Sequence, residues 1–410
     1  MRLYARLFRL IWGADVDAAL RPLLAVSFVG SAAFSAGWTF VGIWAIEELG
    51  ASSQQLAVAY LLAAVAGFVA GYLGGHLSDY VGRRPMILLG WAFLAATFLA
   101  YTFVGHHVLL GLGLASLAGV GGSIGGGADL AMVADLVPRE RHEDGYASVR
   151  VANNLGVVFG PPIGGVLLIG RHWSFFFAGV TVLGLVAIAI GYRFLPRTGA
   201  YAPTEPPSRG SFGVIRRDHA FLLFLVSAGL AYLVYVAYET VIPIAAVNSY
   251  GISPSAWGFM VIINPLLVTL FQLRLTRWTS GWSPGPKLAA AMLLMGWSLL
   301  LLLVTGSAAM FVLVLFVFVV GEMLWVPTSQ AIVAGLAPED VRGAYMGAFG
   351  SMGAVGFALG PFAGLQLRGA YGDNAAWYFF AAVALVAAVT GLAAVRGASR
   401  RRVTPVAAGY

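Results

Sequence analysis

Long apolar stretches recur along almost the whole of this 410-residue chain, and they limit its possible folds more than any other feature. A helix of roughly 20 mostly apolar residues is long enough to cross the hydrocarbon layer of a membrane. Only 10% of the residues are charged, whereas soluble domains carry roughly 25%. Since such a chain cannot cover a large water-facing surface, the sequence predicts an integral membrane protein.

Helices are the expected spanning element, because backbone N–H and C=O groups find no water inside hydrocarbon. The apolar runs are too continuous for barrel strands, which alternate polar and apolar side chains. We therefore predict an all-α membrane protein with about twelve transmembrane helices. Their expected spans are residues 20–46, 56–78, 85–104, 108–136, 145–170, 173–195, 219–247, 254–278, 287–305, 309–336, 342–367 and 375–396.

The positive charges predict the orientation of these helices. With these spans, all of the 24 Lys and Arg residues except Arg171 and Arg368 fall on one side of the membrane. Loops rich in Lys and Arg stay in the cytoplasm, so we expect both termini to be cytoplasmic and the protein to be multi-pass in the cell's inner (plasma) membrane. This asymmetry explains the net charge of +7, and no nucleic-acid partner is expected. The basic segment Met1 to Trp12 is either an interfacial anchor or a solvated tail.

The chain divides near its middle at a polar stretch rich in Pro, Ser, Gly and Arg. We predict an N-terminal six-helix bundle over residues 1–195, a cytoplasmic linker over 196–218 and a C-terminal six-helix bundle over 219–410. Part of the first half recurs 200 positions later, which indicates an internal duplication. The recurring residues are Gly156, Gly160, Pro161 and Gly164, found again at 356, 360, 361 and 364.

The loop after the second span reads Gly75-His-Leu-Ser-Asp79-Tyr-Val-Gly82-Arg83-Arg84. Asp79 closes a helix, where its carboxylate can meet a helix N-terminus or an arginine, and Gly82 permits a tight turn. The two arginines alone would also satisfy the positive-inside rule. The whole pattern resembles the signature loop of the major facilitator superfamily.

That resemblance implies a transporter with the major facilitator fold, in which two six-helix bundles are related by a pseudo-two-fold duplication. It also implies that this loop latches the two halves together, with Asp79 meeting the start of the eleventh helix. The matching loop of the second half has Arg277 in the place of Asp79. A second latch of the same kind is therefore not expected.

A gapped glycine-proline motif in the fifth span resembles that of the proton antiporter branches, the drug exporters especially. Its residues are Gly156, Gly160, Pro161, Gly164 and Gly165. Glycines four apart allow close helix contact and a proline can bend the helix, although generic packing of a glycine-rich helix is the alternative. The chain departs from the drug exporters in having Ala147 where their motif begins with Gly, and Arg150 in the fifth span but no arginine in the fourth. These departures weaken the transfer of their proton-relay scheme.

Three carboxylates inside predicted spans are candidates for proton coupling: Glu322, Glu239 and Asp129. An ionisable group at the centre of a spanning helix costs roughly 2.5–3.5 kcal/mol on insertion scales, which makes it a functional candidate. Desolvation favours the protonated carboxyl, so such a group can carry a proton one way while cargo moves the other. The alternatives are a permanently protonated structural carboxyl and, for Asp129, an ion pair with Arg150.

Aromatic and amide side chains on the same helices suggest the kind of cargo. Aromatic faces with one or two acids suit amphipathic or cationic organic compounds, although ordinary helix packing also uses such residues. The candidate substrate-cavity residues are Trp38, Tyr232, Tyr235, Trp325, Asn153, Asn154 and Asn264.

The sequence therefore predicts proton-coupled efflux (antiport) of small amphipathic or cationic organic compounds by alternating access. Its expected partners are a small-molecule substrate, protons and the lipid bilayer, and we expect a monomer. The alternatives are a proton-coupled symporter importing a sugar, organic acid or peptide, and a lipid exporter. The chain lacks cysteine and shows no His/Asp metal cluster, nucleotide loop or nucleophile elbow, so we expect no enzyme, catalytic residue, metal or cofactor.

Overall fold

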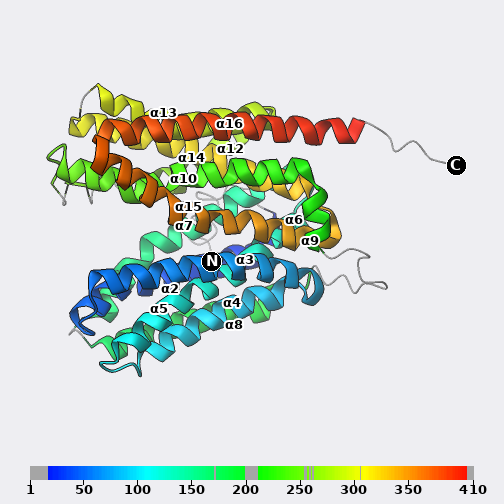
Figure 1. Cartoon of the computed structure of the whole chain (residues 1–410). Helices are drawn as coiled ribbons and strands as arrows, with labels where there is room; N and C mark the ends of the chain where they lie inside the picture. Colours follow the sequence, from blue (N-terminus) through cyan, green and yellow to red (C-terminus); the bar gives the residue numbers. More distant parts are fainter. Residues whose placement is uncertain are drawn as a thin grey trace. The chain divides into compact units, whose positions relative to one another are not determined.

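The structure is a computed structural model, and it describes residues 17–169, 172–198, 211–253, 256–257, 260, 263–304 and 306–403 (Figure 1). All regular secondary structure within these ranges is helical. The predicted segment Met1 to Trp12, Arg171 and most of the predicted linker 196–218 lie outside the described residues.

The helices of the described chain follow the apolar stretches of the sequence. The first part of the chain forms η1 (Ala18–Leu20), α2 (Arg21–Glu47), α3 (Ser53–Val81), α4 (Arg83–Tyr101), α5 (Val108–Ile124), α6 (Gly126–Leu136), η2 (Arg139–Arg141), α7 (His142–Leu167) and α8 (Trp173–Phe194). The second part forms α9 (Ser211–Arg217), α10 (His219–Asn248), α12 (Ile263–Trp278), α13 (Pro284–Ser298), η3 (Leu299–Leu303), α14 (Ala308–Leu336), η4 (Glu339–Val341), α15 (Arg342–Tyr371) and α16 (Asp373–Val403).

Ten helical segments of the described chain are long and apolar enough to cross a membrane, which confirms the predicted multi-pass membrane fold. The predicted fifth span forms α7, which is 26 residues long but carries Arg150, Asn153 and Asn154 among its apolar residues. The predicted eighth span contains α12, of which 16 residues are described. The predicted fourth span is interrupted at Gly125, where α5 ends and α6 begins. The total of about twelve spans stays a prediction.

Local sequence signals explain where several helices begin and end. A capping box starts α3: the Ser52 hydroxyl accepts from the backbone N–H of Gln55 at 3.2 Å, and the Gln55 side chain accepts from the N–H of Ser52 at 2.9 Å. The turn between α3 and α4 is the single residue Gly82, whose φ of +94° favours glycine. The tight turn that the signature loop predicts is therefore present.

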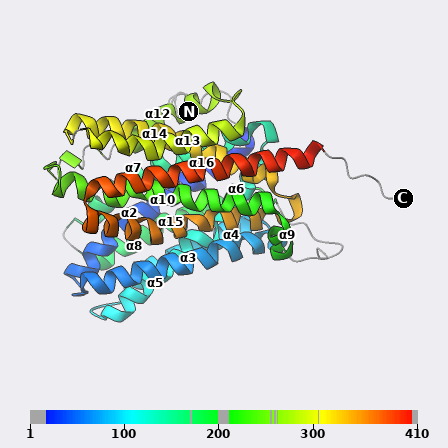
Figure 2. The same ribbon diagram turned by 45° about the horizontal axis from the view of Figure 1, so that its top comes forward.

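The described residues pack as two compact units. The first comprises residues 1–204 with 265–274 and 339–354; the second comprises 205–264, 275–338 and 355–410. In the first, α2 packs against α7 and α8, α3 against α5, and α4 against α5 and α8 (Figure 1). In the second, α16 packs against α10 and α13, and α13 packs against α14 (Figure 2). The predicted domain boundaries at 195 and 219 stay predictions.

The glycines of the predicted fifth-span motif form a helix contact inside the first unit. A Cβ on Gly156 would lie 2.5 Å from the carbonyl oxygen of Phe28, and one on Gly160 would lie 2.6 Å from the Cβ of Ser35, both on α2. Gly164 also packs against α2, whereas a Cβ on Gly165 would meet no described atom within 4 Å. Small residues thus let α7 approach α2 closely.

The repeated glycines of the second unit make the corresponding contact with α10. A Cβ on Gly356 would lie 2.6 Å from the Cβ of Tyr232, and one on Gly360 would lie 3.1 Å from the carbonyl oxygen of Leu233. Each copy of the motif therefore packs against the first long helix of its own half of the sequence. This agreement supports the duplication that the 200-residue offset indicates.

Candidate functional site

The signature-loop carboxylate Asp79 is almost completely buried and accepts three hydrogen bonds. The backbone N–H groups of Gly343 and Ala344 donate to its two oxygens at 2.8 and 2.9 Å. The Arg83 guanidinium donates to it at 2.5 Å. Because α15 begins at Arg342, Asp79 binds the positive end of that helix, which is the eleventh predicted span. The expected contact between Asp79 and the start of this span is present.

A second carboxylate, Asp135, lies in the same place and is not among the sequence candidates. Arg83 Nε donates to one of its oxygens at 3.1 Å, and Arg342 Nη1 donates to the other at 2.6 Å. Asp79, Arg83, Asp135 and Arg342 thus form one network, which we call the charged cluster. The signal that could have found it is a further part of the internal repeat. Asp135 lies within Ala134-Asp-Leu-Val-Pro138, which recurs 200 positions later as Ala334-Gly-Leu-Ala-Pro338, just before Arg342.

Close backbone packing surrounds the charged cluster. A Cβ on Gly75 would lie 2.2 Å from the carbonyl oxygen of Gly343 and 2.8 Å from the Cα of Gly347. Only a residue without a side chain fits where α3 and the start of α15 approach so closely. The second loop arginine, Arg84, is only partly buried: it donates to the Tyr192 carbonyl oxygen, and its guanidinium lies 5.1 Å from the centre of the Tyr192 ring.

In the second unit, Glu322 is the most deeply buried of the predicted proton-coupling acids. Its side chain on α14 is 1% exposed, and the Asn264 Nδ2 donates to its carboxylate at 2.6 Å. Glu239 on α10 is exposed, and its charge interacts with that of Glu322. Tyr238 stands next to them and is hydrogen-bonded to the backbone of Asn264. The structure therefore brings together Glu239, Asn264 and Glu322, three candidates from different predicted spans.

Three of the predicted cavity aromatics also meet in the second unit. The ring centres of Tyr232 and Trp325 lie 4.8 Å apart, and those of Tyr235 and Trp325 lie 6.2 Å apart. Trp325 is buried, and its indole N–H has no hydrogen-bond partner among the described residues. Trp38 belongs to the first unit, where it stacks on Phe34 at 5.6 Å.

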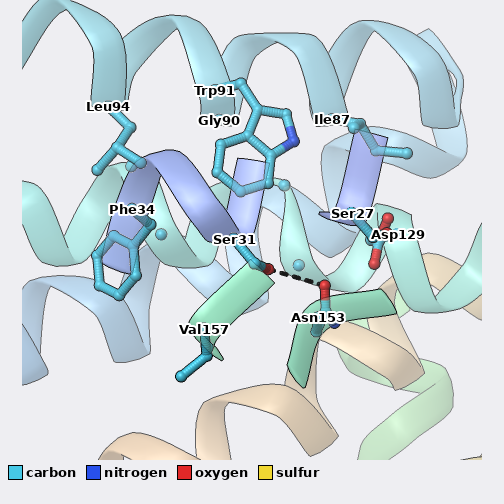
Figure 3. Close-up of a pocket in the computed structure, with 14 residues that line it drawn as sticks. Ser27, Ser31, Phe34, Ile87, Gly90, Trp91, Leu94, Asp129, Asn153 and Val157 are labelled. Atoms are coloured by element: carbon cyan, nitrogen blue, oxygen red, sulfur yellow. Dashed lines mark hydrogen bonds between the residues drawn. The ribbon is translucent and has the colours of Figure 1, made fainter. Parts of the chain in front are cut away.

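The first unit contains a cavity of about 350 Å³ (Figure 3). Two of the predicted site residues line it, Asp129 and Asn153, and Asn153 accepts a hydrogen bond from the Ser31 hydroxyl at 2.9 Å. The full set of lining residues is Ser27, Ser31, Phe34, Ile87, Gly90, Trp91, Leu94, Gly121, Gly122, Gly125, Gly126, Asp129, Asn153 and Val157.

Two predicted polar residues on α7, Asn154 and Arg150, do not line this cavity. The Asn154 side chain donates to the carbonyl oxygen of Arg150 at 3.0 Å, one turn back along the helix. Asp129 makes no ion pair with any described residue, so the alternative pairing of Asp129 with Arg150 is not observed. Within the described ranges, no group of three or more His, Asp and Glu residues is placed to hold a metal ion.

Comparisons with known proteins agree with this architecture. A Na⁺, Li⁺, K⁺/H⁺ antiporter of Planococcus maritimus is 23% identical over 382 residues, covering 85% of this chain and 89% of the relative. The multidrug resistance protein MdtH of Yersinia pestis is 29% identical over 326 residues, covering 78% of this chain and 79% of the relative.

Solved structures share the fold at lower identity. The human organic anion transporter MFSD10 superposes with a TM-score of 0.69 at 18% identity, over 92% of this chain and 100% of that structure. A bacterial homologue of the iron transporter ferroportin superposes with a TM-score of 0.70 at 17% identity, over 94% and 100%. A sequence model of one transporter family matches residues 23–361 and again 226–408, and these ranges include most of the described helices. The chain belongs to the Major Facilitator Superfamily.

Proposed function

We propose that this transporter is a proton-coupled exporter of small amphipathic or cationic organic compounds, of the twelve-helix drug:proton antiporter branch. The observation that carries the proposal is the burial of Glu322 inside α14 with Asn264 as its hydrogen-bond partner. A carboxyl inside a spanning helix is costly and is retained mainly where it moves ions or binds a ligand. Glu322 is therefore the first candidate for the group that exchanges protons.

The neighbours of Glu322 support a coupled site in the second unit. Glu239 on α10 interacts electrostatically with Glu322 on α14, so the second unit places two acids near each other. The aromatic group of Tyr232, Tyr235 and Trp325 provides flat apolar surfaces that suit organic cations. Protonation of the acids would compete with binding of a cation, which is the exchange that an antiporter requires.

The relatives support the same general chemistry. The names of the two sequence relatives describe proton exchange in one case and multidrug resistance in the other. Their identities of 23% and 29% leave the substrate of this chain to experiment. We further propose that the protein works as a monomer in the inner (plasma) membrane with both termini in the cytoplasm, and that its two halves alternate access to one substrate site.

In this mechanism the charged cluster is the cytoplasmic latch. Asp79 holds the first turn of α15 through two backbone N–H groups, and Asp135 holds Arg342. These contacts are charge-assisted and enclosed, so they stabilise the state in which they form. Their release would accompany the opposite state of the transport cycle.

The test is proton-driven transport by purified protein in liposomes. With an inward-directed proton gradient, we expect the wild type to move a fluorescent organic cation against its own gradient. Glu322→Gln cannot ionise, so we expect pH-driven flux to fall by at least about tenfold, because one coupled charge is removed from the membrane interior. Glu140→Gln, at an exposed position, is the matched control and should keep wild-type flux. Wild-type proton coupling in both Glu322→Gln and Glu239→Gln would contradict the assignment.

A second candidate is exchange of inorganic monovalent cations for protons, which the Na⁺, Li⁺, K⁺/H⁺ antiporter relative favours. The same liposomes distinguish it. Addition of NaCl, LiCl or KCl would then dissipate an imposed pH gradient without any organic cation. Gradients that collapse only with organic cations would favour the first proposal.

A further inference from the structure

We propose that the first-unit cavity is a binding site for a small organic monocation, such as a protonated primary amine, held by the Asp129 carboxylate. This inference deepens the proposed function and rests on it only for the transport of the bound amine. The binding itself is a property of residues 27–157 alone, all of which belong to the first unit.

The cavity is large enough for an organic ligand and has a polar and an apolar part. Its volume of about 350 Å³ falls in the range of roughly 300–1,000 Å³ typical of small-molecule pockets. Figure 3 shows Ser27 and Asp129 at one end, and Phe34 and Leu94 at the other. An amphipathic molecule could therefore place its charged group beside Asp129 and its hydrocarbon part beside the apolar side chains.

Two polar side chains that line the cavity have no partner among the described residues. Asp129 makes no hydrogen bond or ion pair through its side chain with any described residue. Ser27 is 3% exposed, and its hydroxyl likewise lacks a partner among the described residues. Buried polar groups are nearly always hydrogen-bonded, so the unpaired Ser27 hydroxyl, in a cavity that the half-buried Asp129 carboxylate also lines, indicates a place for a ligand. The ligand must supply donors and a positive charge.

A primary ammonium matches these groups because it carries one charge and three N–H donors. One donor would go to Asp129, and the oxygens of Ser27, Ser31 and Asn153 are further side-chain acceptors that line the cavity. The Ser31 hydroxyl already donates to Asn153, which fixes that amide with its oxygen toward Ser31. Trp91 adds an aromatic face, and its ring is fixed by close contact with Gly30. Aromatic faces attract cations, so the wall also favours a positive ligand.

Small residues line the cavity next to Asp129. Gly125, the single residue between α5 and α6, keeps a right-handed helical conformation, and Gly126, Gly127 and Ala128 follow it. Gly125 and Gly126 both line the cavity, and a Cβ on Gly126 would meet no described atom within 4 Å. The absence of side chains here leaves space near Asp129 that a full-sized side chain at position 126 would occupy.

Asp129 is the one carboxylate among the described residues that line this cavity, so a proton and an ammonium compete for it. If Asp129 is protonated, binding of RNH₃⁺ releases one H⁺ to solvent and leaves the carboxylate paired with the ammonium. Binding should consequently weaken as the pH falls. This competition would give the first unit its own proton–amine exchange step.

The experiment is isothermal titration calorimetry of phenethylamine into the purified full-length protein in detergent micelles. We expect saturable binding, and Asp129→Asn should weaken it roughly 10- to 100-fold, since a charged hydrogen-bond partner is lost. Ser27→Ala is the second variant and should weaken binding several-fold. The matched controls are Glu140→Gln, an exposed charge, and Ser116→Ala on α5, whose hydroxyl bonds to its own helix. Both should bind as the wild type does.

Titrations with other compounds identify the class of ligand. Phenethyl alcohol has the same shape without the charge, and NaCl or LiCl supplies a charge without the hydrocarbon part. Repeating the titration in two buffers of different ionisation enthalpy gives the number of protons released. The proposal predicts binding of the amine alone, with proton release that grows as the pH is lowered.

Three results would overturn the proposal: no amine binding by the wild type, undiminished binding by both Asp129→Asn and Ser27→Ala, or equal binding of the alcohol. Displacement of the amine by millimolar NaCl or LiCl would assign the site to an inorganic cation instead. Amine binding without pH-driven flux in liposomes would retain this site and reject the proposed export. If pH-driven flux is observed but both variants bind the amine as the wild type does, the proposed export is retained and this site is rejected.

Discussion

Replacing Asp79 with alanine is expected to lower the free energy of unfolding by about 3–5 kcal/mol, because it removes one carboxylate from a buried ion-pair network and leaves an excess positive charge there. Arg83 is fully buried, and Asp79 is an acceptor for its Nη1. The same substitution also leaves the backbone N–H groups of Gly343 and Ala344 without their acceptor. Each enclosed donor that loses its partner costs about 1–3 kcal/mol. The loss should therefore be among the largest that a single side chain of this protein can produce.

Denaturant unfolding of the purified protein in mixed micelles measures this effect. Arg84→Ala is the matched control, since Arg84 belongs to the same loop but is partly open to solvent. We expect it to change the unfolding free energy by less than about 1 kcal/mol. The double variant Asp79→Ala/Arg83→Ala should be more stable than Asp79→Ala alone, because Asp135 and Arg342 then remain as a balanced ion pair without an excess guanidinium. If Asp79→Ala unfolds at the wild-type denaturant concentration, the described network does not stabilise the protein.

Replacing Gly75 with alanine is expected to cost about 3 kcal/mol, although alanine is the better helix former. The added Cβ would lie 2.2 Å from the carbonyl oxygen of Gly343, a distance that no rotamer change can relieve because both atoms are held by backbone. Helix α3 and the first turn of α15 would have to separate. This separation would also lengthen the hydrogen bonds from α15 to Asp79, so the two effects should be coupled.

A glycine in open surroundings provides the comparison. Gly113 on α5 meets no described atom within 4 Å of its would-be Cβ. Gly113→Ala should leave stability unchanged or raise it by about 0.5–1 kcal/mol, the usual helix-propensity gain. The same unfolding measurement applies to both variants. Equal stability of Gly75→Ala and Gly113→Ala would mean that α3 and α15 are farther apart than the structure places them.

The membrane fold could be predicted from the sequence because its cause is local. Apolar stretches of spanning length have few alternatives to a helix, and the turn at Gly82 follows from a residue that tolerates positive φ. The contact of Asp79 with the eleventh span is also expected, but from a resemblance and not from the physics of the residues. Neither composition nor periodicity says which helix N-terminus a carboxylate will meet.

The partnerships among distant polar residues are harder to predict. Asp135 lies near the end of α6 and looks like an ordinary interfacial acid, yet it binds Arg83 and Arg342. The pairing of Asn264 with Glu322 joins residues 58 positions apart. The unpaired state of Asp129 and Ser27 could not be predicted at all, since a missing partner is a property of the packed structure. Candidates can be read from the residue types, and packing decides which of them meet.

The balance of charges in the charged cluster has a consequence for the energetics of the transporter. Two buried carboxylates face two guanidiniums, so their charges balance, while the exposed Glu339 lies 4.0 Å from Arg342 at the edge of the network. Any movement that takes Arg342 away leaves Asp79 and Asp135 to share a single positive charge. The uncovered surface would then be anionic by one unit, and salt or a captured proton would lower the penalty for exposing it. Ionic strength should thus influence how readily this protein changes state, independently of the cargo it carries.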